Sequence, residues 1–266
     1  MPKESLMSAS LQGDLADPDA LVRAWDEQQS AYIAGRESRF RAITDIIGLA
    51  CGDEPVVVDL ACGPGSLSAR ILDALPGARV IALDFDPLLL DLAGRTLGAH
   101  HRFGVVEADL AEDTWPDAVA AATAGTPISA FVSTTALHWL TPQTLLGVYT
   151  AAAEMLSDNG LLLNGDHFRF DGRQPTLRRL SAAHDAATQS RAYAAGSPTW
   201  DQWWAAATAR DGVADLAALR DQRFTHRNPP PTTAVDFHLA ALAQAGFSEV
   251  GTVWQLLDDY VVMGVK

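Results

Sequence analysis

The chain has 266 residues, which is enough for a single domain with a sizeable hydrophobic core. Hydrophobic residues make up 48% and charged residues 20% of it, a composition typical of globular proteins. The net charge of −14 argues against nucleic acid as a substrate or partner, because binding to a phosphate backbone requires a basic surface.

Cysteine content and hydropathy narrow the class of protein further. The two cysteines, Cys51 and Cys62, are too few for a disulfide framework or a zinc site. The sequence shows neither an N-terminal signal pattern nor an apolar run of ~18 residues. We therefore expect a cytoplasmic protein that does not contact a membrane.

The first predicted elements are helical. Residues 1–17 are polar and aperiodic, so we expect a loose tail there and a single domain over 18–266. Apolar residues recur with helical spacing over 18–50, and Gly35 interrupts the pattern. This predicts two N-terminal helices.

Strands and helices then alternate along the chain. Asp86 followed by Pro87 is a strong signal for the start of a helix. The alternation predicts a parallel sheet with helices on both faces. The expected strands are 55–60, 79–84, 103–107, 128–133 and 161–165, and the expected helices between them are 67–75, 87–97, 116–124 and 142–156.

The alternation stops after the fifth strand. Residues 167–231 show helical stretches and no convincing strand, so we expect a helical lid inserted into the domain. A helix over 233–245 and two apolar runs, 247–256 and 260–265, follow. Asp258-Asp259 between these runs predicts the turn of an antiparallel hairpin.

A glycine loop after the first strand carries the strongest functional signal. The strand ends in Asp59, the loop contains Gly63 and Gly65, and the next strand ends in a second acid, Asp84. In a βαβ unit, such glycines let a cofactor approach bare backbone, and the second acid can accept ribose hydroxyls. The pattern predicts a site for an adenosyl cofactor.

S-adenosylmethionine fits this loop better than a nicotinamide dinucleotide. The loop lacks the third glycine of the dinucleotide fingerprint. Asp59 would also place a negative charge beside a pyrophosphate, whereas S-adenosylmethionine has a cationic end and no phosphate. A nicotinamide-dependent oxidoreductase is therefore the weaker alternative.

Four stretches resemble motifs of the class I S-adenosylmethionine-dependent methyltransferases, of the small-molecule, type 11/12-like kind. They are 56–65, the strand ending at Asp84, 106–110 and 133–140. The resemblance implies a Rossmann-like, seven-stranded, mostly parallel sheet with an antiparallel C-terminal strand. It assigns to the cofactor the loop residues Asp59, Ala61, Gly63 and Gly65, Asp84 for the ribose, Phe85, Asp109 and Leu110 for the adenine, and the backbone near Ser133 for the methionine moiety.

Candidate catalytic residues follow the fourth and fifth strands. His138 lies after the fourth strand, and Asp166 and His167 follow the fifth, at the carboxyl edge where open α/β sheets bind ligands. Histidine suits proton transfer near neutral pH, so His138 and His167 are the catalytic candidates. Asp166 and Trp139 are candidates for substrate contact. A metal bound by these residues is a weaker alternative, because no ligand motif is present.

Tryptophans of the expected lid form a second candidate region. Trp200, Trp203 and Trp204 share one helical face, after a capping box that begins at Thr199. They either pack the lid against the core or form a wall for an apolar substrate, for which Trp200 and Trp203 are the candidates. Tyr32 and Arg36 are further candidates for the cofactor carboxylate, with Arg39 and Arg41 as competitors.

The sequence thus predicts S-adenosylmethionine-dependent methyl transfer to a small molecule, with S-adenosylhomocysteine as the product. Oxygen, as a carboxylate or a hydroxyl, is the expected acceptor, and no metal is expected. An N- or C-methyltransferase remains an alternative. So does a protein that binds the cofactor but performs another reaction or senses a ligand.

Overall fold

The computed structural model describes residues 17–225, 227 and 233–266. The predicted tail, except for Asp17, and parts of the predicted lid after residue 225 lie outside these residues. The strands of the described chain are β1 (Val56–Leu60), β2 (Arg79–Asp84), β3 (Phe103–Glu107), β4 (Ile128–Thr134), β5 (Leu156–His167), β6 (Glu249–Leu256) and β7 (Asp259–Val265).

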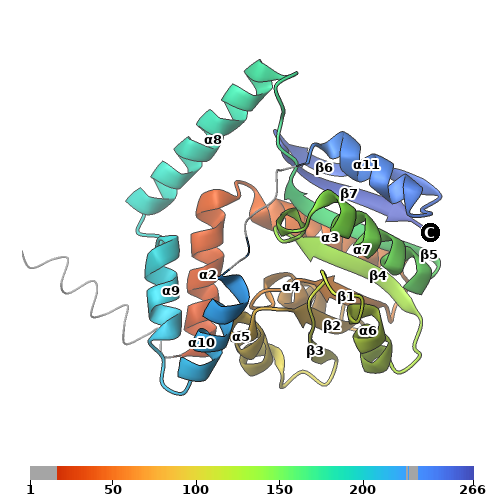
Figure 1. The fold of residues 1–266 in the computed structure, drawn as a ribbon, viewed down its shortest axis with the longest axis horizontal. Coiled ribbons are helices and arrows are strands. Elements are labelled where there is room, and N and C mark those ends of the chain that lie inside the picture. The colour runs from red at the N-terminus through yellow and green to blue at the C-terminus, as the bar shows by residue number, and fades with distance from the viewer. Residues whose placement is uncertain (1–16, 226, 228–232) are drawn as a thin grey trace, which may run out of the picture.

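These strands form one seven-stranded sheet in the order β3-β2-β1-β4-β5-β7-β6 (Figure 1). Strands β1 to β5 pair in parallel, and β7 is antiparallel to both β5 and β6. The predicted fold class, a mostly parallel sheet that ends in an antiparallel hairpin, is confirmed.

One strand and one turn differ from the prediction. β5 begins at Leu156, which pairs with Ile128, instead of at the predicted residue 161, and Asn159, at φ 62°, lies within the strand as an irregularity. In the hairpin, Leu257 takes the left-handed conformation at φ 55°, and Asp259 already pairs as the first residue of β7. The turn is therefore formed by 257–258, one residue earlier than predicted.

Helices cover both faces of the sheet because buried apolar residues occupy both sides of its central strands. Val57 packs in a cluster with α3 (Arg36–Ala50) and α4 (Ser66–Ala74). Its neighbour Val58 faces the other way, into a cluster with α6 (Trp115–Thr123), α7 (Pro142–Met155) and α11 (Val235–Gln244). Successive residues of a strand point to opposite faces, and both faces here are buried.

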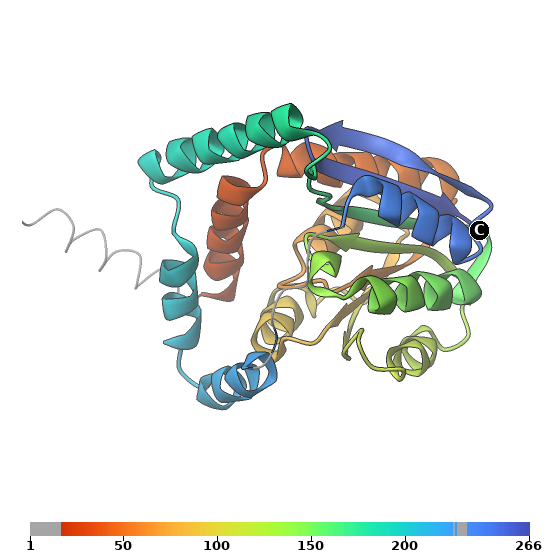
Figure 2. The ribbon, with the colours of Figure 1, turned by 45° about the horizontal axis from the view of Figure 1, so that its top comes forward.

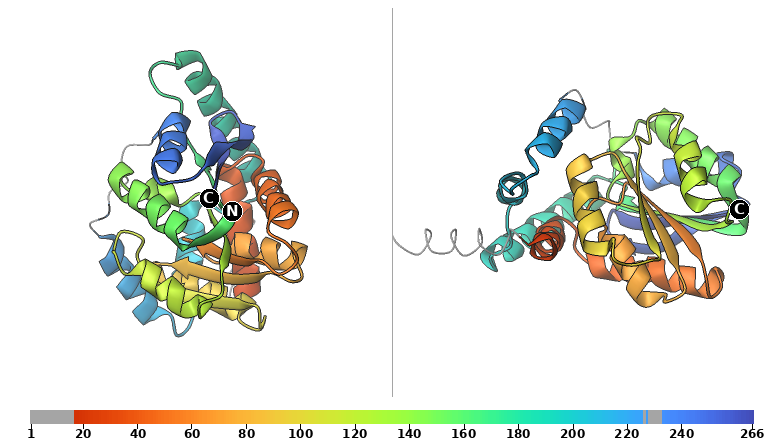
Figure 3. Two further views of the ribbon diagram at one scale, coloured as in Figure 1. Left: turned by 90° about the vertical axis from the view of Figure 1, so that its right-hand side faces the viewer. Right: turned by 90° about the horizontal axis from the view of Figure 1, so that it is seen from below.

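A group of helices lies beside the sheet instead of on its faces (Figures 1 and 2). It consists of α2 (Pro18–Tyr32), α8 (Pro175–Ala194), α9 (Trp200–Thr208) and α10 (Ala214–Phe224). Seen from below, these helices project away from the sheet on one side (Figure 3). None of the helices in the described part of the chain is both long and apolar enough to cross a bilayer.

Local sequence signals account for the ends of these elements. Gly35, at φ 77°, separates α2 from α3 as predicted. The predicted capping box is present at the start of α9, where Thr199 Oγ1 and the Gln202 side chain exchange hydrogen bonds with backbone N–H groups. Asp86 caps α5 (Pro87–Leu97), also as predicted.

Candidate active site

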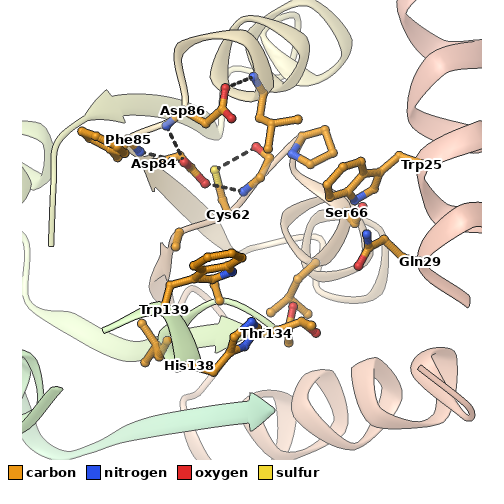
Figure 4. Close-up of a pocket in the computed structure, with 18 of the residues that line it drawn as sticks. Trp25, Gln29, Cys62, Ser66, Asp84, Phe85, Asp86, Thr134, His138 and Trp139 are labelled. Carbon is orange, nitrogen blue, oxygen red and sulfur yellow. Dashed lines mark hydrogen bonds between the residues drawn. The ribbon is translucent and has the colours of Figure 1, made fainter. Parts of the chain in front are cut away.

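A cavity of about 650 Å³ lies between the carboxyl edge of the sheet and the group of helices beside it. Loops after β1, β2, β3, β4 and β5 form one side of it, and α2, α8, α9 and α10 contribute the other. Figure 4 shows the part of its wall formed by 84–86, by 134–139 and by Trp25 and Gln29 of α2. Its volume falls within the ~300–1,000 Å³ typical of small-molecule sites.

The loop after β1 presents backbone to the cavity. Ala61, Gly63 and Gly65 all have positive φ angles, of 54°, 57° and 85°. A Cβ on Gly63 would meet no atom closer than 4.0 Å, so this glycine keeps open space in the cavity wall. A Cβ on Gly65 would lie 2.9 Å from Leu97 of α5, so Gly65 serves close packing and does not line the cavity.

Asp84, at the end of β2, is a hydrogen-bond acceptor in the cavity wall, and backbone N–H groups hold its carboxylate in place. Its Oδ2 accepts a hydrogen bond from Gly63 N, and its Oδ1 accepts from Phe85 N and Asp86 N, each at 2.7 Å (Figure 4). Burial raises the pKa of Asp84 to about 6. A carboxylate has about four lone-pair sites, so acceptor capacity remains for ligand hydroxyls.

The side chains of Asp59 and Ser133 lie behind the wall, whereas the sequence prediction placed Asp59 at the cofactor. For Ser133 the prediction concerned only the backbone near it, and the neighbouring Thr134 does line the cavity. Asp59 is fully buried and accepts a hydrogen bond from Ser68 Oγ at 2.7 Å. Burial, with a smaller contribution from Asp84, raises its pKa to about 7. Ser133 Oγ donates to Leu60 O at 2.8 Å. Both side chains hold strand ends together below the cavity.

The residues expected at the adenine line the cavity together with arginines that the sequence motifs did not indicate. Phe85, Asp109 and Leu110 are all in the wall. The guanidinium of Arg227 pairs with Asp109 and lies 4.0 Å from the centre of the Phe85 ring. Arg220, within α10, also lines the cavity, and Arg227 follows that helix; no sequence motif identifies either of them.

His138 and Asp166 form a hydrogen-bonded pair at the opposite side of the cavity. His138 Nδ1 lies 2.8 Å from Asp166 Oδ1, and its backbone N–H donates to Asp166 Oδ2 at 3.1 Å. Asp166 is fully buried and does not line the cavity, whereas His138 does. Because Nδ1 binds Asp166, Nε2 is the ring nitrogen left to meet a ligand.

The two histidines that share Asp166 have pKa values shifted in opposite directions. Burial opposes protonation of His138, but the Asp166 carboxylate outweighs it and raises the pKa of His138. Burial, with repulsion from Arg169, lowers the pKa of His167 to about 4. In return, the charge of protonated His138 and its hydrogen bond hold the pKa of Asp166 below its usual range, although burial alone would raise it. His167 is therefore neutral near pH 7, and His138 is the residue that titrates.

Tryptophans from two parts of the chain meet at the outer side of the cavity. Trp25 of α2 lies 5.9 Å from Trp200, 4.6 Å from Trp203 and 6.3 Å from Trp204, measured between ring centres. Trp200 and Trp204 line the cavity, and Trp139 lies across it, 46% exposed. Trp203 instead is buried, and its Nε1 donates to Leu21 O at 3.0 Å. Trp203 therefore packs the helix against α2, as one interpretation predicted, whereas Trp200 lines the cavity, as the other predicted for a substrate wall.

No group of three or more histidine, cysteine or acidic side chains suited to a metal ion occurs within 17–225, 227 and 233–266. Tyr32 and Arg36 both line the cavity, and Arg36 pairs with Asp26 at 2.8 Å. Arg39 instead is buried in a pair with Asp259 at 2.7 Å.

The strand order and the glycine loop correspond to those of one known class of protein. A seven-stranded sheet with an antiparallel β7, and acids at the ends of β1 and β2, is the arrangement of a class I S-adenosylmethionine-dependent methyltransferase. S-adenosylmethionine is the cofactor of this class, and four residues that the sequence assigns to it, Gly63, Asp84, Phe85 and Asp109, all line the cavity.

Comparison with known proteins agrees with this class. A family profile described as "Methyltransferase domain" matches residues 57–160. Trans-aconitate 2-methyltransferase from Azoarcus sp. (strain BH72) is 36% identical over 74 residues, which are 27% of this chain and 28% of that protein. Release factor glutamine methyltransferase from Chlorobaculum tepidum is 39% identical over 75 residues, or 27% of this chain and 26% of that protein.

A solved structure matches over most of the chain. Magnesium protoporphyrin IX methyltransferase from Synechocystis PCC 6803, determined with bound S-adenosylhomocysteine, superposes with a TM-score of 0.54 at 13% identity. The match covers 90% of this chain and 86% of that one. The chain spans only about a quarter of the length of the curated relatives named above. Residues 57–160 thus match a methyltransferase domain, and the predicted resemblance to the S-adenosylmethionine-dependent methyltransferases agrees with this profile and with the fold of the solved structure.

Proposed function

We propose that the protein methylates an oxygen atom of a small, largely apolar acceptor, with His138 as the general base. The observation that carries this proposal is the His138–Asp166 pair in the cavity wall. S-adenosylmethionine supplies the methyl group from its sulfonium. The acceptor oxygen forms a bond to this carbon as the carbon–sulfur bond breaks, and S-adenosylhomocysteine leaves.

Removal of the acceptor proton is the step that His138 performs. Asp166 fixes the ring orientation and stabilises the imidazolium, so Nε2 can take a proton from a hydroxyl. His167, with its lowered pKa, stays neutral beside it and can hydrogen-bond the acceptor. The surroundings of His138 and His167 thus shift their pKa values apart. Such a separation is expected of two groups with distinct roles in proton transfer.

The composition of the wall favours an apolar or aromatic hydroxyl compound over a polycarboxylate. Trp25, Trp139, Trp200 and Trp204 provide aromatic surface. A polycarboxylate would require free cations, and the arginines in the described wall already have acidic partners. These pairs are Arg36–Asp26, Arg169–Asp185, Arg220–Asp86 and Arg227–Asp109.

A carboxylate acceptor is the second candidate, favoured by the relative named trans-aconitate 2-methyltransferase. A carboxylate needs no base, and protonated His138 would then bind it as a cation. Because the matched segment of that relative is 27% of this chain, it carries little information about the substrate side. Methyl transfer to nitrogen or carbon, ligand sensing and a location in the cytoplasm remain predictions.

The pH dependence of turnover separates the two candidates. We would incubate the protein with S-adenosylmethionine and a panel of phenols, aliphatic alcohols, and mono- and tricarboxylic acids, and detect methylated products by mass spectrometry. With a hydroxyl acceptor, kcat should rise with pH through the pKa of His138 and then level off. With a carboxylate acceptor, kcat should not rise with pH.

Matched variants test the role of each residue. Asp166→Asn removes a hydrogen bond to a charged group, worth about 1.5–3 kcal/mol, so kcat/KM should fall on the order of 10- to 100-fold. The midpoint of its pH profile should move to lower pH, because the charge that raises the pKa of His138 is gone. His138→Gln should abolish the pH dependence, and His100→Gln, on the exposed surface, is the control. Full activity of His138→Gln would refute the proposed base.

A further inference from the structure

Three arginines at the end of the helical segment contact the acidic ends of β2 and β3. Arg220 Nε donates to Asp86 Oδ2 at 2.7 Å. Arg223 donates to Phe85 O at 2.6 Å and pairs with Glu107. These contacts hold α10 over the part of the site where Phe85 and Asp109 lie.

Arg227, just beyond α10, makes the contacts expected of an adenine ring. Its guanidinium is planar, lies 4.0 Å from the centre of the Phe85 ring and donates to Asp109 Oδ2. An adenine bound as the sequence predicts would place its flat face on Phe85 and donate from its amino group to Asp109. The Arg227 guanidinium and an adenine ring are both flat, and both carry N–H donors in their plane. Phe85 and Asp109 together can hold only one such group at a time.

We infer that Arg227 and the adenine of the cofactor compete for the position between Phe85 and Asp109. Arg227 is then a residue that sets cofactor affinity by occupying its subsite, and the cofactor must displace it to bind. Arg223 also lies near the Phe85 ring, 5.2 Å from its centre, but Arg227 is closer and alone of the three pairs with Asp109. Displacement of Arg227 leaves the contacts of Arg220 with Asp86 and of Arg223 with the Phe85 backbone in place. This inference rests on the cofactor site described above and is independent of the acceptor.

The expected effect follows from the fraction of time for which the subsite is open. Apparent affinity equals intrinsic affinity multiplied by that fraction, so an arginine that holds the position ~80–90% of the time weakens binding roughly 5- to 10-fold. Arg227→Ala should therefore bind S-adenosylhomocysteine roughly 5- to 10-fold more tightly than the natural chain. This ligand has no sulfonium, which limits the effect of simply removing a positive charge from the protein.

The experiment is isothermal titration calorimetry with S-adenosylhomocysteine, repeated with adenosine. Arg191→Ala is the matched control, because Arg191 lies on α8, its side chain donates to Thr188 Oγ1 and it does not line the cavity. It should leave both affinities unchanged. Adenosine should gain as much from Arg227→Ala as S-adenosylhomocysteine does, since the competition concerns the adenine alone.

Each other outcome overturns the inference. Weaker binding by Arg227→Ala would make Arg227 a ligand of the cofactor, and unchanged binding would show that it does not hold the subsite. Because the assay measures binding and not methyl transfer, either result leaves the proposed base and acceptor untouched. Failure of every variant to bind S-adenosylhomocysteine would refute the cofactor site, and the proposed function would fall with this inference.

Discussion

Cofactor affinity should depend on pH through Asp84. This side chain is 8% exposed, and burial raises its pKa to about 6. Its ionised form accepts three backbone hydrogen bonds and is the form suited to accept a further one from a ribose hydroxyl. Lowering the pH through 6 should therefore protonate the Asp84 carboxylate and weaken its hydrogen bonding to the cofactor.

The size of this effect follows from the fraction of ionised Asp84. If only the ionised form binds, the apparent Kd rises by a factor of about 1 + 10^(pKa − pH), which is ~1.1 at pH 7, ~2 at pH 6 and ~11 at pH 5. Affinity should thus fall roughly tenfold between pH 7 and pH 5, which corresponds to about 1.4 kcal/mol. Asp59, whose pKa is raised to about 7, would give a step one pH unit higher if it were the acceptor.

The same carboxyl group has the opposite effect on folding. An aspartate titrates near ~3.9 when unfolded, so the folded chain holds the Asp84 proton more tightly. Its contribution to the free energy of unfolding is full below about pH 4 and is lost as the pH rises through about 6. Acidification should therefore weaken cofactor binding without loss of this contribution to stability.

Calorimetric titration with S-adenosylhomocysteine at pH 5, 6 and 7 measures the predicted step. Asp84→Asn should bind weakly at all three values and show no step, whereas Asp45→Asn, on the exposed face of α3, should behave like the natural chain. A Kd that stays constant from pH 5 to 7 in the natural chain would refute the reasoning. A step that persists in Asp84→Asn would assign the titration to another group.

Two predictions concern stability and are measured by denaturant unfolding. Gly65→Ala should lower the free energy of unfolding by about 1–2 kcal/mol, because φ is 85° there and the new Cβ would lie 2.9 Å from Leu97 Cδ1. Unchanged stability would show that the loop relaxes without cost. Trp203→Ala should cost about 3–5 kcal/mol, since the side chain is buried and bonded to Leu21 O. Trp200→Ala, at a position 41% exposed, should leave stability nearly unchanged, and equal losses in both variants would contradict this assignment.

Much of the fold was predictable because its signals are local. Strands 79–84 and 103–107 and helix 87–97 have the predicted bounds, since apolar runs, Asp86-Pro87 and Gly98 mark their ends in the sequence itself. The hairpin turn was misplaced by one residue because Leu257, a residue without turn preference, adopts the left-handed conformation. The carbonyl of Asp258 accepts from Phe168 N, and such a tertiary contact has no local signal.

The candidate site was predictable on its cofactor side and only in part elsewhere. Gly63 and Asp84 belong to short motifs that directly follow strands, so their position at the cavity follows from the fold. Helical periodicity placed Trp200 and Trp203 on one face but could not decide which of them turns toward the cavity. That choice depends on Trp25, which meets them from α2, far away in the sequence.

Charge compensation explains why the arginines of α10 lie where they do. Asp84, Asp86, Glu107 and Asp109 gather at the ends of β2 and β3, in a chain whose net charge is −14. Buried or half-buried carboxylates repel one another unless cations or N–H donors lie beside them. Backbone N–H groups satisfy Asp84, whereas the other three acids each pair with one arginine from the helical segment. The acids that make the edge fit for an adenosyl cofactor therefore also attract α10 to it, so cofactor binding and the position of this helix are governed by the same charges.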